Sequence, residues 1–254
     1  MLGLGRRRRT VGVDVGSARL KVAVVDHSRG SPRLQKAGVC SLDDAGGRTA
    51  GRGRVTRAIR SLFEAEGLPR RGVVCGVGGR DVIVKLVRMD RAWEGRGREA
   101  IRRRASREVP LDSATVETDV LLVDGDGDSP RMTVLLVAAR REVVAARIGL
   151  LQAAGLEPGV VDAEALALHN CLEFNHPEAM DGVVGLVCVG YRRTTLNVAE
   201  DGTPVLVRDL SFGTGDLRRT LCEEHGMSDG LAEDVLRGRI RPLSRPVART
   251  VRRP

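Results

Sequence analysis

The sequence predicts a mixed α/β protein in which two strand hairpins, each turning on a glycine, open two α/β units. Three observations support this fold class. Strand-like runs alternate with runs of helical apolar spacing, glycines fall at the ends of many of these runs, and the hairpin at Gly16 is followed about 175 residues later by a second at Gly190. The 254 residues can bury a substantial core as one large or two modest domains.

The first unit begins with a hairpin, because two β-rich stretches flank a Gly-Ser turn. A mostly loop-like segment over residues 28–54 follows, with one short strand near its centre. The next apolar residues have helical spacing and end at Gly67, a natural helix stop. The expected strands and helix of this unit are Val11–Val15, Leu20–Val25, Gln35–Leu42, Thr56–Glu66 and Gly72–Val77.

The second unit has the order strand, helix, strand, strand, helix. Its first helix is strongly charged, is loose at its start because of Gly95 and Gly97, and ends before Pro110. Residues 124–130 contain a D-G-D-G-D run that lacks the later glutamate of a calcium loop, so a solvated hairpin loop is expected. The elements are Asp81–Met89, Asp90–Val109, Thr115–Val123, Met132–Ala139 and Arg141–Gly155.

The third unit combines a strand and a helix with a meander of three strands and two final helices. Asp201-Gly202 is a plain hairpin signal, and Ser228 is a suitable N-cap. From Gly238 onward the sequence has three prolines and no acid, which predicts disorder. The elements are Gly159–Val161, Glu164–Phe174, Val183–Val189, Thr194–Ala199, Val205–Leu210, Gly215–His225 and Ser228–Arg237.

The net charge of +9 lies at the two ends of the chain. Arg6–Arg9 and the seven arginines from residue 237 onward carry +11, whereas residues 10–236 carry −2. The tails therefore suggest an anionic partner such as nucleic acid or an acidic membrane, but the body does not.

Other classes are disfavoured by composition. No apolar run approaches the roughly 20 residues of a membrane-spanning helix. The five cysteines are scattered and form no CxxC pair, which argues against a zinc site or a disulfide framework and favours a reducing cytoplasm. Five aromatic residues are too few for base-stacking recognition of single strands.

The two glycine turns are the candidate functional site. In the first turn, successive backbone N–H groups can cradle a phosphate, Ser17 adds a hydroxyl donor and Asp14 can hold a metal-bound water. Lys21 lies four residues beyond the turn on the returning strand. The hairpin from Val187 to Thr195 repeats this arrangement, and the repetition makes the signal more specific than a single Gly-Ser turn.

These features resemble the actin-like ATPase superfamily and, within it, the type IV pilus assembly protein PilM family, which is related to the cell-division protein FtsA. The resemblance covers about residues 10–237. It rests on VGVDVGSARLKVAVVD, on the insert at about 82–140, on LLVAARREVVAARIGLLQAAGLEPGVVDAEALAL and on the second hairpin with DGTPVLVRDLSFGTGDL. Asp14, Gly16, Ser17, Ala18 and Lys21 match the first phosphate motif of the family, and Gly190, Thr194 and Thr195 match the second.

The resemblance implies an α/β fold of actin-like (ribonuclease H-like) lobes with an inserted strand-helix-strand-strand subdomain and an incomplete second lobe. It also implies ATP with Mg²⁺ between the lobes, and a groove for the N-terminal cytoplasmic peptide of an inner-membrane PilN-like partner. The implied divisions are a basic tail at 1–9, the first lobe at 10–80, the insert at 81–156, a partial second lobe at 157–237 and a disordered tail at 238–254.

The chain departs from the family pattern in three places. Cys188 stands where the second phosphate strand ends in an aspartate, and a neutral thiol cannot replace a carboxylate beside magnesium. Tyr191, Arg192 and Arg193 crowd the second turn, although arginines can also bind phosphate. A Gly-rich adenosine motif is absent, and the resemblance stops near Gly238. Impaired ATP binding, a C-terminal truncation and no ATPase activity are therefore expected, with no catalytic residue or metal ligand assigned.

The expected function is that of a cytoplasmic, membrane-peripheral scaffold of type IV pilus assembly. It binds a PilN-like peptide through the first lobe and insert, and pilus motor components are further partners. Two alternatives remain. A functional FtsA-like ATPase of cell division would need the missing aspartate and adenosine motif, and a nucleic-acid binder would act through the basic tails.

Overall fold

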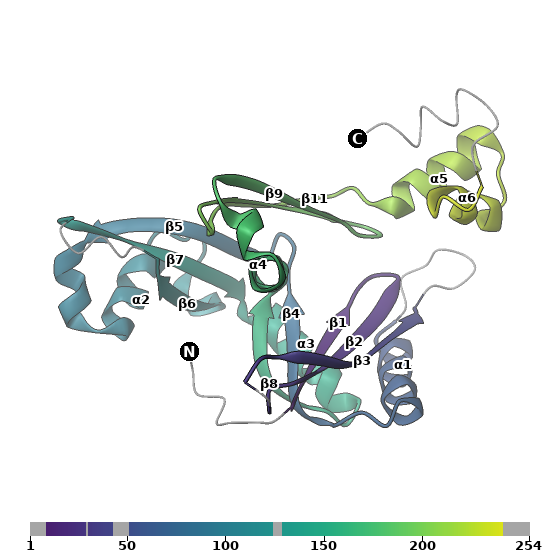
Figure 1. The fold of residues 1–254 in the computed structure, drawn as a ribbon, viewed down its shortest axis with the longest axis horizontal. Coiled ribbons are helices and arrows are strands. Elements are labelled where there is room, and N and C mark those ends of the chain that lie inside the picture. The colour runs from purple at the N-terminus through teal and green to yellow at the C-terminus, as the bar shows by residue number, and fades with distance from the viewer. Residues whose placement is uncertain (1–8, 29, 43–50, 124–128, 241–254) are drawn as a thin grey trace.

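A computed structural model of the chain describes residues 9–28, 30–42, 51–123 and 129–240. These residues form three sheets, which we name the first sheet, the insert sheet and the second sheet in chain order. Figure 1 shows the insert beside the first sheet and the second sheet lying across both. The mixed α/β fold class is confirmed.

The first sheet has the strand order β3-β2-β1-β4-β8. Strands β1, β2 and β3 form an antiparallel meander, and β4 and β8 run parallel to β1. The predicted hairpin at Gly16 and the edge strand are therefore confirmed. The strands are β1 (Arg9–Val15), β2 (Arg19–Asp26), β3 (Arg33–Ser41), β4 (Arg71–Val77) and β8 (Glu157–Ala163).

The core of the first sheet is covered by α1 (Arg52–Ala65) and α3 (Arg141–Ala153). In α1 the buried residues Val55, Ile59 and Phe63 are spaced four apart, so they share the face that packs on the sheet. Complete burial of a side chain such as Phe63 contributes about 2–3 kcal/mol. The helix ends where predicted, because Gly67 adopts a positive φ of 57°.

The insert sheet has the order β5-β7-β6, with both neighbouring pairs antiparallel. The helix predicted over 90–109 is divided rather than continuous: the chain forms a 3-10 helix and then α2, separated at Gly97, one of the two glycines expected to loosen its start, whose φ is 81°. Strand, helix, strand, strand is nevertheless the observed order. The elements are β5 (Val82–Asp90), the 3-10 helix (Arg91–Arg96), α2 (Arg98–Ser106), β6 (Val116–Leu122) and β7 (Arg131–Arg140).

The second sheet is an antiparallel meander with the order β11-β10-β9. One of its faces packs against α4, and the chain ends its described part in two helices that pack on each other. Ser228 caps the last of these helices by accepting a hydrogen bond from the backbone N–H of Leu231. The elements are α4 (Glu164–Asn175), a 3-10 helix (Pro177–Met180), β9 (Val183–Val189), β10 (Thr194–Glu200), β11 (Thr203–Leu210), α5 (Thr214–His225) and α6 (Asp229–Leu236).

The strand order moves one expected boundary. The sequence placed the second lobe at 157–237, but β8 is hydrogen-bonded to β4 inside the first sheet, so the crossing to the second sheet comes at Ala163–Glu164. The D-G-D-G-D run at 124–128, residues 1–8 and residues 241–254 lie outside the described residues. Within the described part, no helix is long and apolar enough to cross a membrane.

Candidate functional site

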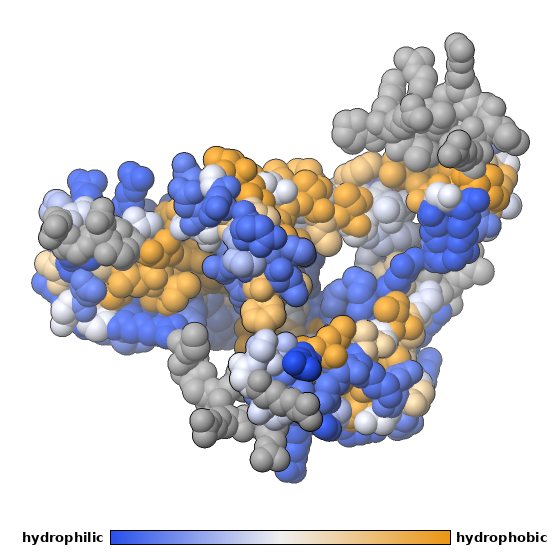
Figure 2. Space-filling view, viewed as in Figure 1, coloured by the Kyte–Doolittle hydropathy of each residue, from blue (hydrophilic) through white to orange (hydrophobic). Residues whose placement is uncertain are grey.

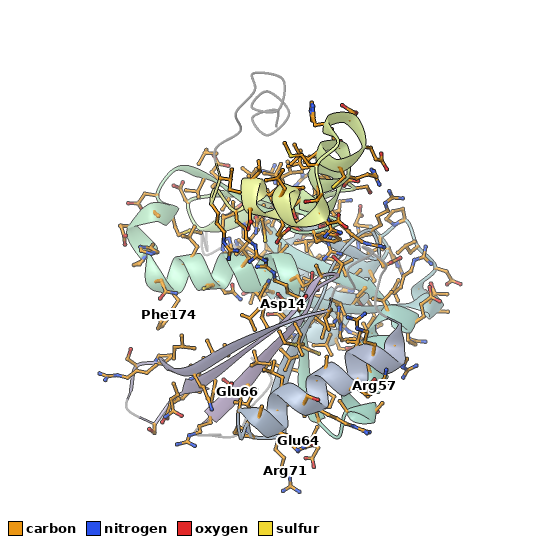
Figure 3. All side chains as sticks on the ribbon, turned by 90° about the vertical axis from the view of Figure 1, so that its right-hand side faces the viewer. Asp14, Arg57, Glu64, Glu66, Arg71 and Phe174 are labelled. Carbon is orange, nitrogen blue, oxygen red and sulfur yellow. The ribbon has the colours of Figure 1, made fainter. Side chains whose placement is uncertain are left out.

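The first glycine turn joins β1 to β2 and presents two charged side chains. Asp14 and Lys21 are paired across the hairpin, and their side chains form an ion pair at 2.8 Å while remaining about half exposed. Figure 3 shows Asp14 at the end of the first sheet that approaches the later helices. The ammonium group of Lys21 is thus directed to Asp14.

The backbone of the first turn bonds within the protein. The N–H of Gly16 donates to the carbonyl of Arg19 at 3.0 Å, and a Cβ at Gly16 would lie 2.9 Å from that same oxygen. The turn therefore needs glycine for close backbone approach. Ala18 is buried, and its carbonyl accepts from the N–H of Leu42 at 2.8 Å. Ser17 is partly exposed at the tip.

The second turn repeats the backbone geometry of the first. The N–H of Gly190 donates to the carbonyl of Arg193 at 2.8 Å, and a Cβ at Gly190 would lie 2.7 Å from that oxygen. Both predicted threonines donate to the protein: Thr194 Oγ1 to the carbonyl of Phe212 at 2.8 Å, and Thr195 Oγ1 to Asp209 Oδ1 at 2.6 Å.

Arg193 turns from the second glycine turn toward two carboxylates. Its guanidinium donates to Glu164 and contacts Asp209, with 3.2 Å between Nε and Oδ1. The group also lies against the glycines at 78 and 79, since a Cβ at Gly79 would be 2.7 Å from Nη1 of Arg193. The backbone N–H of Gly79 completes the contact by donating to Asp209 Oδ2 at 3.0 Å. A side chain at Gly79 would displace the guanidinium.

Arg147 of α3 extends this contact to the first turn. Its Nη1 donates to the carbonyl of Val15 at 3.2 Å, and its Nη2 lies 3.7 Å from Glu164 Oε1. We call Arg147, Glu164, Arg193 and Asp209 the ion-pair chain. It links the end of β1, the helix α3, the start of α4, the second turn and β11.

The ion-pair chain has a strongly desolvated centre. Burial raises the pKa of the Glu164 carboxyl above its ordinary value, and the nearby Asp14 and Asp209 carboxylates act in the same direction. The positive charges of Arg193 and Arg147 oppose this shift. The influence of Asp14 on Glu164 also places the first turn within electrostatic reach of the chain.

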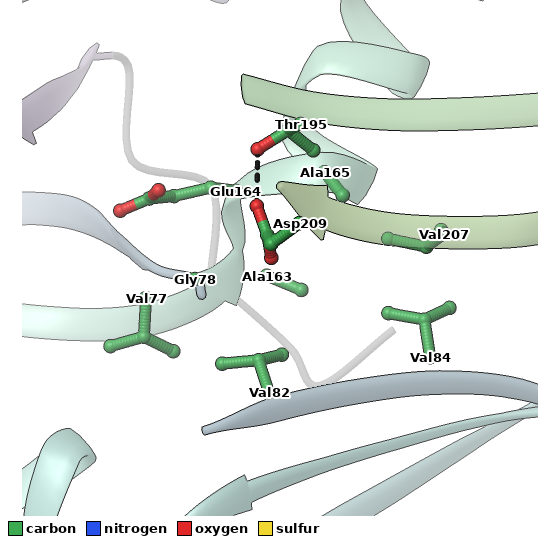
Figure 4. Close-up of a pocket in the computed structure, with 10 residues that line it drawn as sticks. All are labelled: Val77, Gly78, Val82, Val84, Ala163, Glu164, Ala165, Thr195, Val207 and Asp209. Carbon is green, nitrogen blue, oxygen red and sulfur yellow. Dashed lines mark hydrogen bonds between the residues drawn. The ribbon is translucent and has the colours of Figure 1, made fainter. Parts of the chain in front are cut away.

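The space beside the ion-pair chain is small. Thr195, Asp209 and Glu164 are among the residues that line a cavity, drawn in Figure 4, whose volume is about 10 Å³. This volume suits about one water molecule, whereas a site for a drug-sized ligand occupies about 300–1,000 Å³. Apolar side chains such as Val82 and Val207 line its other side.

The beginning of α5 packs directly on the second turn. The backbone N–H groups of Thr214 and Gly215 donate to the carbonyls of Gly190 and Tyr191 at 2.9 and 2.8 Å. A Cβ at Gly213 would lie 2.6 Å from the Gly190 carbonyl oxygen, so only glycine fits there. The first free N–H groups of α5 are thus bonded to the turn itself.

The structure brings most of the predicted residues to one region but pairs them differently from expectation. Asp14 faces Lys21, Thr194 and Thr195 bond to backbone and Asp209, and Cys188 is exposed beside Thr195 in the β9–β10 ladder. No group of three or more His, Cys, Asp or Glu in the described ranges is placed to hold a metal ion.

Sequence reasoning missed Arg147, Glu164 and Asp209. Each lies in a different element, and only the packing of the two sheets brings them together. Two signals were present in the sequence: the adjacent glycines 78 and 79 after a buried strand, and the glycines 213 and 215 before a helix. Such glycines mark close backbone approach.

Comparison with protein families gives one match over most of the chain. The family model described as "Type IV pilus assembly protein PilM" matches residues 12–243. A structure described as the "PilM-PilN type IV pilus biogenesis complex" is similar with a TM-score of 0.75 and 26% sequence identity, covering 96% of this chain and 74% of that chain.

Two more distant structures share the fold. The ethanolamine utilization protein EutJ of Carboxydothermus hydrogenoformans has a TM-score of 0.55 at 17% identity, covering 99% of this chain and 69% of its own. The cytoplasmic domain of EpsL, an inner-membrane component of the type II secretion system of Vibrio cholerae, has a TM-score of 0.51 at 16% identity, covering 87% and 78%.

Proposed function

The chain belongs to the type IV pilus assembly protein PilM family, whose model matches residues 12–243, and from this premise we propose that it is a scaffold for a PilN-like peptide. The observation that carries the proposal is the similarity to the PilM-PilN complex over 96% of this chain. The partner in this proposal is the N-terminal cytoplasmic peptide of an inner-membrane protein. The scaffold is accordingly cytoplasmic and peripheral to the inner membrane.

The peptide is proposed to bind along β6, the edge strand of the insert sheet, which begins where the insert meets the first sheet. Figure 2 shows the surface hollowed between these two parts. The edge strand β6 exposes two large apolar residues, Leu121 and Leu122, and such side chains serve as anchors for a bound segment. Arg141, at the junction, pairs with Glu117 of β6 at 2.7 Å and so holds this edge against α3.

The ATP site implied by the fold is proposed to be degenerate and the protein to have no ATPase activity. Support comes from the residues present: Arg193 of the second turn is already paired with the carboxylates of Glu164 and Asp209. Cys188 offers an exposed thiol in place of a carboxylate. These residues do not fit Mg-ATP, and the proposed scaffold needs no reaction step.

A binding measurement tests the scaffold proposal. The full chain is titrated with the N-terminal cytoplasmic peptide of a PilN-like protein, and a scrambled peptide serves as the control. Micromolar or tighter affinity is expected only for the native order of residues. Equal binding of both peptides, or none, contradicts the proposal.

Two matched variants locate the groove. Leu121→Lys on β6 and Leu34→Lys on β3 replace leucines that are 61% and 66% exposed. The first is expected to weaken peptide binding at least tenfold because it puts a charge at the anchor, a loss of about 1.4 kcal/mol. The second is expected to leave binding unchanged. Equal effects of the two variants would place the peptide elsewhere.

A further inference from the structure

The backbone of β6 directs alternate residues to the outer edge of the insert sheet. The N–H of Val123, just past the strand, donates to the carbonyl of Thr133 on β7 at 3.0 Å, in register with the antiparallel pairing of β6 and β7. Because only alternate residues of an antiparallel strand bond to a given neighbour, the residues between them direct their N–H and C=O groups outward. These outward residues are Val116, Thr118, Val120 and Leu122.

Arg102 of α2 is bonded to one of the outward carbonyl groups. Its Nη1 donates both to the carbonyl and to the hydroxyl oxygen of Thr118, each at 3.3 Å. Glu99 holds the same guanidinium through two bonds, with 3.0 Å from Nε to Oε2 and 2.7 Å from Nη2 to Oε1. Paired bonds of this kind fix the orientation of both groups. The carbonyl of Thr118 therefore already has a charged donor.

A ring of hydroxyl bonds holds Arg102 against β6. Ser106 donates its hydroxyl proton to the carbonyl of Arg102 at 2.7 Å, so the 3.1 Å contact between the hydroxyls of Ser106 and Thr118 uses the proton of Thr118. Thr118 Oγ1 in turn accepts from Arg102. Figure 1 shows α2 beside β6, the two elements that this ring joins. The ring keeps the guanidinium at the middle of the strand.

A carboxylate is bonded to the next outward group. Asp119 Oδ1 accepts from the backbone N–H of Val120 at 2.9 Å and from Nη2 of Arg98 at 2.6 Å. Arg98 is the first residue of α2, so the contacts of both Arg102 and Asp119 depend on this helix. One carbonyl and one N–H in the middle of the edge are therefore bonded to side chains. Charged side chains at the edge of a sheet oppose the addition of a strand.

We propose that Arg102 and Asp119 close the edge of β6 in the free chain, and that a bound segment must displace both side chains to pair with the whole strand. This inference rests on the proposed function, in which the PilN-like peptide lies along β6. A strand added to this edge would use the carbonyl of Thr118 and the N–H of Val120, the same two groups that the side chains bond. The exposed Leu121 offers a first contact, and pairing along the edge follows when the side chains move aside.

Arg102→Ala tests the displacement, and Arg103→Ala is its matched control. Both variants remove an arginine from α2, but Arg103 is mostly exposed and pairs with Glu99 of its own helix at 4.0 Å. The N-terminal cytoplasmic peptide of a PilN-like protein is titrated into the full chain of each variant. Arg102→Ala is expected to bind about five- to tenfold more tightly than the wild type, because hydrogen bonds to a charged group no longer have to break. Arg103→Ala is expected to bind as the wild type does.

Hydrogen exchange tests the closed edge without the peptide. Arg98→Ala removes the guanidinium that holds Asp119, so the amide of Val120 is expected to exchange about fivefold faster than in the wild type. Arg103→Ala is again expected to leave this rate unchanged. The emission of Trp93, the single tryptophan of the chain, checks that each variant is folded, because this residue packs against the core of the insert.

The two measurements separate the closed edge from the scaffold function. The closed edge is overturned if Arg102→Ala binds the peptide no more tightly than Arg103→Ala, or if the exchange of Val120 is unchanged in Arg98→Ala. Absence of peptide binding in every variant, together with faster exchange of Val120 in Arg98→Ala, would instead contradict the scaffold function and support the closed edge.

Discussion

At the scale of single residues, Glu164 determines how the two turns are held. It is a mostly buried carboxylate between two guanidinium groups, and removing either arginine would leave it poorly compensated. Sequence inspection identified Asp14 and Thr195 from local patterns. It could not identify Glu164, because the role of this residue depends on its ion pairs with Arg147 and Arg193, which lie in other elements.

Burial of Glu164 gives a pH prediction. Because the pKa of Glu164 is raised in the folded state, this carboxyl is protonated in a larger fraction of native than of unfolded molecules once the pH exceeds its pKa in the unfolded chain, about 4.3. The contribution of this group to the unfolding free energy therefore falls as pH rises through that window. The stability of the wild type relative to Glu164→Gln is expected to decrease from pH 4 toward pH 7 in urea titrations.

Glu157→Gln is the control for this experiment, because Glu157 is an exposed glutamate on β8. It accounts for the general effect of deleting one carboxylate. A wild-type advantage over Glu164→Gln that grows with pH would contradict the assignment of burial as the dominant cause.

At the scale of elements, strands and helices follow closely from local patterns. Alternation and helical spacing predicted β1, β2, α1 and α3, since each buries one face in the same core. The helix predicted over 90–109 was expected to be loose at Gly95 and Gly97, and the structure divides it at Gly97. Glycines therefore indicate where this helix is interrupted, whereas the spacing of apolar residues indicates which face is buried.

The contact between α5 and the second turn gives an element-scale prediction. A Cβ at Gly213 would meet backbone carbonyl groups at 2.5 Å and 2.6 Å, and backbone cannot move aside as a side chain can. Gly213→Ala is expected to lower the unfolding free energy by about 1–3 kcal/mol, as overpacking does. Chemical denaturation measures the loss.

Gly230 provides the matched control, since it lies in α6 with open space around its Cβ position. Gly230→Ala is expected to be neutral or to stabilise the chain by up to about 1 kcal/mol through helix propensity. Similar losses in both variants would mean that glycine at 213 is not required by the turn.

At the scale of the whole molecule, the strands follow one another along the chain in the order that the sequence predicted. The boundary at 157 was misplaced because β8 is separated from β4 by the entire insert, so its pairing is a long-range event. The ion pairs of Arg193 with Glu164 and Asp209 were likewise not predictable from the spacing of residues along the chain.

The pairing of Arg193 with two carboxylates predicts weak nucleotide binding. Mg-ATP bound at the second turn would have to displace Arg193 from Glu164 and Asp209. Titration calorimetry at pH 7 is expected to show no sub-micromolar site for Mg-ATP. Titration of the PilN-like peptide into the same sample verifies that the protein is folded and able to bind. A sub-micromolar dissociation constant for Mg-ATP would contradict the proposed degenerate site.

The single crossing between the first and second sheets has a mechanical consequence. The described chain passes between them only at Ala163–Glu164, so any rotation of the second sheet hinges there. The ion-pair chain lies beside this hinge, so its contacts exert only a small torque against such a rotation. The pair of Arg19 and Glu233, at 3.5 Å, joins the first hairpin to α6, which Figure 1 shows far from α4. Because the Arg19–Glu233 pair lies farther from the hinge than the ion-pair chain does, the same force at this surface contact opposes rotation with a larger torque.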